Sequence, residues 1–291
     1  ARKNVIVFCQ SRFLRIFPAL AVVLLLTVFV LGPCFTSLPL PEYFRHPDTW
    51  RYLVTNGLFY DTQFTLPGVF EQLVYPNDVN SSLWTLPYEV KMYLILAVLG
   101  CLSYAGPRWL PEKQLANLVM LMAVSATACL IYTILLPRKS VEADTMDNLR
   151  FMSLFFIGGA MHIWRDKLRL NAAIVIIMLA LIILLQQKII QPPLIKPYKA
   201  FLISYSLFIA YIVIYLACIP AGFIRRFNQW GDYSYGIYIY AFPVQQTVSA
   251  LHGASSPLLL FAMAFPVTLL FAIASWHWIE QPLLQYKKKS C

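Results

Sequence analysis

Charged residues are scarce in this sequence: they make up 12% of the 291 residues, whereas hydrophobic residues make up 59%. An average soluble domain has about 25% charged residues. The apolar residues also fall in long blocks that contain no charge, and a soluble domain of this length could not cover so much apolar surface. This shortage of charge excludes a soluble globular protein and predicts an all-α, polytopic membrane protein.

Metal-binding and disulfide patterns are also missing. The six cysteines form no CxxC pair and no cluster with the spacing of metal ligands. We therefore expect no disulfide framework, no metal site and no bound cofactor. Internal repeats and low-complexity segments are absent, and no signal peptide is visible before the first apolar block.

The formal net charge of +10 does not indicate nucleic-acid binding. The basic residues lie in short clusters between the apolar blocks, and they form no single stripe that could follow a phosphate backbone. Membrane topology explains them better, because Lys and Arg gather in cytoplasmic loops. We therefore expect the lipid bilayer, and no nucleic acid, as a partner.

Eight transmembrane helices are predicted, since a helix needs about 20 mainly apolar residues to cross a bilayer. Their residues are 16–41, 92–107 with an extension back through Trp84, 114–137, 151–164, 170–187, 200–224 and 233–279, the last block being broken into two spans at 253–257. We expect these helices to form one membrane-embedded domain, residues 1–291.

The basic residues also predict the orientation. Most of the 23 Lys and Arg residues fall in inside loops if the N-terminus is cytoplasmic. Eight helices bring the chain back to its starting side, so we predict both termini in the cytoplasm of an inner or plasma membrane. Segment 35–83 then forms a long outside loop that is rich in aromatic residues. It is either a wall that faces a carbohydrate or a packed cap over helix ends.

A carboxylate stands at the mouth of one predicted span. Pro87 suits the first turn of a helix, and Thr85 or Ser82 can cap the free backbone N–H groups. Glu89 then lies in or beside this turn, near the positive end of the helix dipole, with Tyr93 at i+4 on the same face. A charge at the lip of a span is costly without a partner or a function. Glu89 is therefore either a functional carboxylate or a residue that only compensates the dipole.

Other polar residues border the spans. Arg12 and Arg15 precede the first one, and they either bind an anion or reflect only the positive-inside bias. Glu280 lies at the predicted C-terminal end of the last helix, where a carboxylate is unfavourable. We expect it to form a structural ion pair with Arg225 or Arg226, with a catalytic role as the less favoured alternative. The tyrosines at 233, 235, 238 and 240 do not share one helical face, and we expect most of them to be packing or interfacial residues.

Five segments follow one another in an order that resembles the acyltransferase-3 family of membrane-embedded O-acyltransferases. They are residues 12–20, 80–89, 155–160, 231–243 and 278–283, which together extend over nearly the whole chain. One departure is Ala241, because some members of the family have a histidine at this position.

The resemblance implies an enzyme of ten helices that transfers an acyl group, most often acetyl. The donor is a cytoplasmic acyl-CoA, and the acceptor is a hydroxyl of an envelope or exported carbohydrate. We expect Glu89 to orient the catalytic base or the acceptor hydroxyl, and Tyr93 to donate a hydrogen bond. The other expected site residues are Asn80, Ser82 and Trp84 for the acceptor, and Arg12 and Arg15 for the phosphates of CoA.

The family's expected base is a histidine on its first helix, which also carries an arginine. None of the four histidines of this sequence, His46, His162, His252 and His277, has that position. We therefore expect two further helices, with the base, upstream of Ala1. Two other functions stay open: a transporter or flippase of a lipid-linked sugar, and a non-catalytic relative that acts in assembly. Transporters often have repeated halves, and this sequence shows none.

Overall fold

The computed structural model describes residues 5–104, 112–137, 140–190, 192, 195–219, 230–253 and 256–289. These residues form helices and connecting segments without a β-strand, apart from two isolated β-bridges, so the predicted all-α class is confirmed. The chain divides into two compact units. The first consists of Ala1–Tyr93 and Phe227–Cys291, and the second of Leu94–Arg226.

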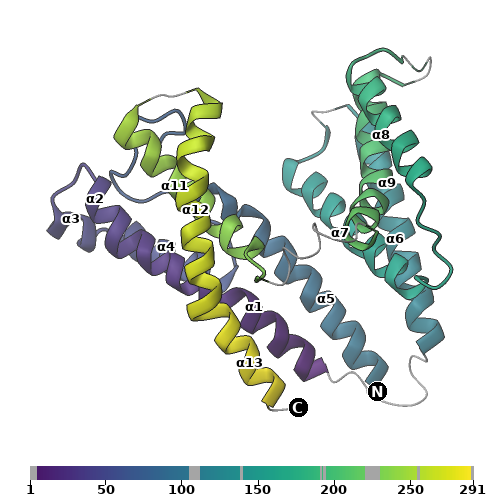
Figure 1. Ribbon diagram of the computed structural model, residues 1–291, viewed down its shortest axis with the longest axis horizontal. Helices are drawn as coiled ribbons and strands as arrows, with labels where there is room; N and C mark the ends of the chain where they lie inside the picture. Colours follow the sequence, from purple (N-terminus) through teal and green to yellow (C-terminus); the bar gives the residue numbers. More distant parts are fainter. Residues whose placement is uncertain are drawn as a thin grey trace. The chain divides into compact units, whose positions relative to one another are not determined.

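Each of the eight predicted apolar segments is mainly helical over its described residues (Figure 1), and residues 105–107 and 220–224 of these segments lie outside the described residues. In order they correspond to α1 (Val5–Leu26), α5 (Leu86–Tyr104), α6 (Glu112–Leu135), α7 (Ala143–Ile163), α8 (Ala172–Gln186), α9 (Pro197–Cys218), α11 (Ser234–His252) and α12 (Pro257–Ser275). Among the described residues, five stretches are long and apolar enough to cross a membrane: Val5–Phe35, Ser81–Cys101, Gln114–Leu135, Pro197–Cys218 and Pro257–Gln285. The count of eight crossings and their orientation stay predictions.

The first helix begins and ends earlier than predicted. It starts by Val5, so Arg12 and Arg15 lie within α1 and not before it. A charge-free block shows where a helix can contact lipid, whereas arginine is itself a good helix former and can extend the helix beyond that block. At the other end, Thr36 has an extended backbone (φ −73°, ψ 140°), which stops the helix before Pro41.

Two π-helical turns, Thr27–Leu31 and Trp276–Glu280, lead into α2 (Gly32–Phe35) and α13 (Gln281–Lys289). Each turn precedes a proline, Pro33 or Pro282. Proline has no N–H to donate, and its ring clashes with the carbonyl four residues earlier. The helix widens at this point and then continues. The prediction that Glu280 lies at a helix C-terminus is therefore wrong.

In the first unit, α1 packs against α4 (Pro47–Leu58), α11 and α13. The core is formed by one face of α1 together with residues from segment 35–83 and from α11. Its buried members include Ile16, Leu20, Val23, Tyr43, Tyr52, Leu83, Ile239 and Tyr240.

Segment 35–83 is ordered, as its aromatic residues predicted, and it includes α3 (Leu40–Arg45) and α4. Tyr43 is fully buried, and its hydroxyl donates to the carbonyl of Val28 at 3.0 Å. Gly32 allows this contact, since a Cβ there would lie 2.0 Å from the Tyr43 hydroxyl oxygen. Burial raises the pKa of Tyr43 to about 12, so the phenol remains a donor. This packing favours the interpretation of the segment as a cap, although Trp50 and Tyr60 are exposed.

Glycines bring the start of α11 against the last helices. A Cβ at Gly236 would lie 2.7 Å from Cα of Ala272, so only glycine lets α11 and α12 approach this closely. Gly231 has φ +151°, and a Cβ there would lie 2.6 Å from Nε1 of Trp276. These contacts position the short segment between Gly231 and Gly236, which contains Asp232.

The second unit contains the part of α5 from Leu94 onward together with α6, α7, α8 and α9, and the last four are drawn in teal to green in Figure 1. The main contacts join α6 to α7 and α8 to α9, and α9 also contacts α6 and α7. Thr127 and Ser153 share a hydrogen bond of 2.8 Å between α6 and α7. The Lys199 ammonium of α9 donates to the carbonyls of Leu135 and Leu136 at 2.8 and 3.0 Å, which ties the start of α9 to the end of α6.

Candidate active site

A cavity of about 440 Å³ in the first unit brings together four of the predicted site residues. Its lining consists of Arg12, Arg15, Ile16, Thr85, Glu89, Tyr93, Ser234, Tyr235 and Tyr238. The volume lies in the range of small-molecule sites, about 300–1,000 Å³. Two guanidinium groups and one carboxylate line it, so it can bind an anion beside a hydrogen-bond acceptor.

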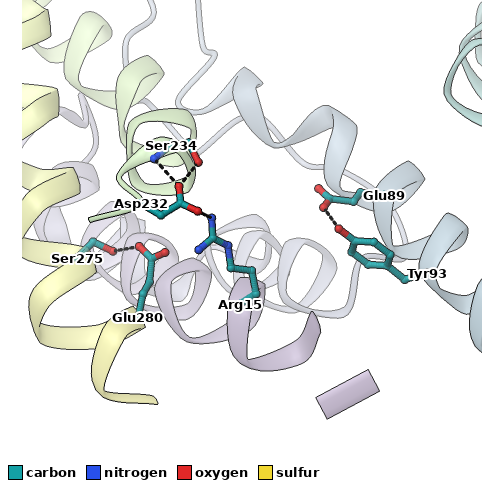
Figure 2. A network of polar contacts seen from close by, with 7 residues as sticks. All are labelled: Arg15, Glu89, Tyr93, Asp232, Ser234, Ser275 and Glu280. Atoms are coloured by element: carbon teal, nitrogen blue, oxygen red, sulfur yellow. Dashed lines mark hydrogen bonds and ion pairs between the residues drawn. The ribbon is translucent and has the colours of Figure 1, made fainter. Parts of the chain in front are cut away.

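Glu89 and Tyr93 form a hydrogen-bonded pair on one wall. Glu89 lies in the first turn of α5 as predicted, and the Tyr93 hydroxyl donates to its Oε1 (Figure 2). The Arg12 guanidinium lies 4.9 Å from the ring centroid of Tyr93 and 5.5 Å from that of Phe8. The carboxylate is therefore oriented by a phenol that itself packs against a cation.

Arg15 forms an ion pair that the sequence did not predict. Its Nη2 lies 2.6 Å from Oδ2 of Asp232, and its guanidinium lies 5.8 Å from the Trp276 ring centroid. The Ser234 hydroxyl donates to the other Asp232 oxygen at 2.5 Å. Burial favours a higher pKa for Asp232, but the hydrogen bond from Ser234 and the charge of Arg15 outweigh it and hold the pKa below its usual value. Asp232 is therefore ionised at neutral pH, and it ties α1 to the start of α11.

Glu280 lies near the same guanidinium (Figure 2). It is fully buried, and its Oε1 accepts a hydrogen bond from the Ser275 hydroxyl at 3.0 Å. Its predicted partners, Arg225 and Arg226, lie outside the described residues. Among the described residues, Arg15 is the cation whose charge acts on Glu280.

The sequence analysis separated Glu89 from the two arginines by the first predicted span, whereas the structure brings these residues together. All three line one cavity, and α4, which precedes α5 in the chain, packs against α1. Thr85 shares this cavity with Ile16. The three charged residues can therefore act on one ligand.

The three residues predicted to bind the acceptor are not among the residues that line this cavity. Asn80 is fully buried, and its amide donates to the carbonyl of Ile239 at 3.0 Å. The backbone carbonyl of Ser82 accepts a hydrogen bond from Tyr238, and Trp84 packs edge-on against Tyr88. In this arrangement, Asn80 and Ser82 hold the turn Ser81–Thr85 against α11.

Sequence reasoning missed Thr85, Ser234, Tyr235 and Tyr238 as lining residues. The Tyr238 and Thr85 hydroxyls share a hydrogen bond of 2.8 Å, and the Tyr235 hydroxyl donates to the carbonyl of Ile16 at 3.0 Å. These tyrosines do pack helices together, as predicted, but they also face the cavity. A signal existed, since all but Thr85 fall in the tyrosine-rich segment 231–243.

The part of the chain that the structure describes contains no candidate set of metal ligands. Three or more His, Cys, Asp or Glu side chains placed to hold one metal ion do not occur there. The residues that line the described cavity include no histidine. The lining residues themselves offer one carboxylate, several hydroxyl groups and two guanidinium groups.

Comparisons with known proteins identify a family and a relative. A family model described as "Acyltransferase domain" matches residues 1–277. A protein named "O-acetyl transferase", from Shigella phage Sf6, is 28% identical over an alignment 294 residues long. The alignment covers 95% of this chain and 77% of that protein. No solved structure gives a significant match.

Proposed function

The chain belongs to the acyltransferase-3 family, and from that premise we propose that it is a membrane O-acetyltransferase. The donor is acetyl-CoA or another acyl-CoA on the cytoplasmic side, and the acceptor is a hydroxyl of an envelope or exported carbohydrate. The family and the long apolar helices make the chain an acyltransferase and an integral membrane protein. The similar phage protein, named an O-acetyl transferase, supports acetyl as the group and oxygen as the acceptor atom.

The main observation in support of this proposal is that Glu89, Arg12 and Arg15 line the same cavity. CoA brings phosphate groups, and guanidinium groups bind phosphate oxygens in pairs of hydrogen bonds. A sugar hydroxyl needs an acceptor that orients its proton, and Glu89 is a carboxylate already held by the Tyr93 hydroxyl. Donor and acceptor can therefore meet in one open cavity.

The proposed step forms one bond and breaks another. Glu89 orients the acceptor hydroxyl, and the general base removes its proton as the oxygen attacks the thioester carbonyl. The family resemblance assigns that base to a histidine. The carbon–sulfur bond then breaks, and the CoA thiolate takes up the proton from the base. Tyr93 is a positioning residue in this scheme, because it reaches the reaction through Glu89.

Radiolabelled acetyl-CoA provides the test. Membranes that contain the full-length protein are incubated with envelope glycan and with CoA carrying the label in its acetyl group. We expect alkali-labile label in the glycan, and none when the label lies in the adenine of CoA. A transporter or a non-catalytic relative would leave the glycan unlabelled in both arms, which would contradict the proposal.

A further inference from the structure

A second cavity, of about 500 Å³, lies in the second unit and takes no part in the proposed reaction. It is formed where α6 ends, where α7 begins and where α9 begins. Both α6 and α9 are long and apolar enough to cross a membrane. The cavity therefore lies at the ends of two candidate spans, at the level where lipid head groups meet protein.

The inner wall of this cavity is mainly apolar. Leu130 and Ile134 are buried there, and Leu202 lies on the facing helix. Two hydroxyls also line the wall, but each donates to a carbonyl of its own helix: Thr133 to Leu130, and Ser206 to Leu202, both at 2.8 Å. A hydroxyl whose proton is bonded to its own backbone can only accept from a ligand, so these two groups add little polarity to the wall. This wall suits a hydrocarbon chain and not a sugar.

Cations line the same cavity. The Arg150 guanidinium is exposed and lies 5.8 Å from the Tyr205 ring centroid. Lys199 uses two of its three ammonium protons on the carbonyls at the end of α6. The ion pairs found among the described residues involve neither of these cations, although Asp147 also lines the cavity. A guanidinium fork and one ammonium proton thus remain for an anion.

We propose that this cavity binds a membrane lipid with a phosphate head group. Arg150 and Lys199 hold the phosphate, and one hydrocarbon chain lies against Leu130, Ile134 and Leu202. The exposed ring of Tyr198 stands at the head-group level, where tyrosines are common. This binding is independent of acyl transfer and would persist if the proposed function were wrong.

Short-chain lipid binding to the purified full-length protein in neutral detergent tests the proposal. The probe is dioctanoyl phosphatidylglycerol, compared with dioctanoylglycerol, which lacks the phosphate, and with inorganic phosphate, which lacks the chains. We expect saturable binding of the phospholipid, with both comparison compounds at least about tenfold weaker. Arg150→Gln should weaken the phospholipid at least about tenfold, and Arg150→Lys should recover part of that loss.

One further variant tests the contribution of the hydrocarbon chain apart from that of the phosphate, and another serves as a control. Leu202→Trp fills the apolar wall without a change of charge, so it should weaken the phospholipid and leave the weak binding of phosphate unaltered. Arg165→Gln is the matched control, since Arg165 is an exposed arginine near Asp166 and outside the cavity. Equal phospholipid affinity in the wild type and Arg150→Gln would overturn the proposal. So would the absence of saturable binding, or inorganic phosphate binding as tightly as the phospholipid.

Discussion

Replacing Asp232 by asparagine should lower the free energy of unfolding by about 1 kcal/mol, because it removes the carboxylate that pairs with Arg15. Asparagine keeps an oxygen that can accept a hydrogen bond from the Ser234 hydroxyl, so the change removes only the charge and the hydrogen bond that Arg15 makes. The two side chains approach to 2.6 Å but are 25% (Arg15) and 51% (Asp232) exposed. Water screens such a pair, so its contribution falls in the range of exposed pairs and well below that of buried ones.

A double-mutant cycle isolates the contribution of this pair. Arg15→Gln, Asp232→Asn and the double variant would be unfolded by titration with SDS in mixed micelles, with helix content followed by circular dichroism. We expect a coupling energy of about 0.5–1 kcal/mol between the two positions. A coupling energy of zero would refute the reasoning, since it would show that the contact does not stabilise the fold.

The pH dependence gives a second check on the same ion pair. Burial acts to raise the pKa of Asp232, but Ser234 and Arg15 outweigh it and leave the pKa below its usual value. A pKa that is lower in the folded state adds stability above the unfolded-state pKa, and this stability is lost as pH falls through the folded-state value. The advantage of the wild type over Asp232→Asn should therefore shrink below about pH 4. An advantage that stays constant down to about pH 2 would contradict a charge effect.

Three further predictions concern the donor, helix packing and topology. Replacing Arg12 and Arg15 together by Gln should raise the KM for acetyl-CoA at least about tenfold and leave the KM for the glycan nearly unchanged, while a double Lys variant recovers only part. If well-inserted double-Gln protein keeps its donor KM, the arginines are topological signals only. Gly236→Ala should destabilise the protein by about 1–3 kcal/mol, because its Cβ would meet the Ala272 backbone at 2.7 Å. The control Gly158→Ala adds a Cβ with no atom within 4 Å and should be neutral or stabilising, so equal thermal stability of the two variants would contradict the packing. In a cysteine-free background, a cysteine at position 61 should react with an impermeant label from outside, and one at position 288 from the cytoplasm only; the reverse pattern would overturn the topology.

Local features of the site could be read from the sequence. The length of the apolar blocks predicted the helices, and the break at 253–257 separates α11, which ends at His252, from α12, which begins at Pro257. Pro87 fixed the start of α5 closely enough to place Glu89 in its first turn and Tyr93 one turn later. These predictions succeed because they depend on helix geometry over a few residues.

Contacts between charged residues that are far apart in the sequence could not be predicted from local patterns. Asp232 is 217 positions from Arg15, and no local pattern connects them. The shared cavity of Glu89, Arg12 and Arg15 was not expected, because the path of segment 35–83 depends on tertiary packing and not on hydropathy. Asn80 shows the same limit. Its amide donates a hydrogen bond to the carbonyl of Ile239, and the sequence alone could not distinguish this structural role from binding a sugar.

Acetyl transfer by Glu89→Gln in membranes tests most directly whether this cavity is the site of reaction. The matched control is Glu42→Gln, an exposed carboxylate on α3 that does not line the cavity. At equal membrane abundance, the account predicts a loss of transfer of at least about 100-fold for Glu89→Gln and near wild-type transfer for Glu42→Gln. Near wild-type transfer by Glu89→Gln would contradict the account and leave Glu89 as a residue that only compensates the helix dipole.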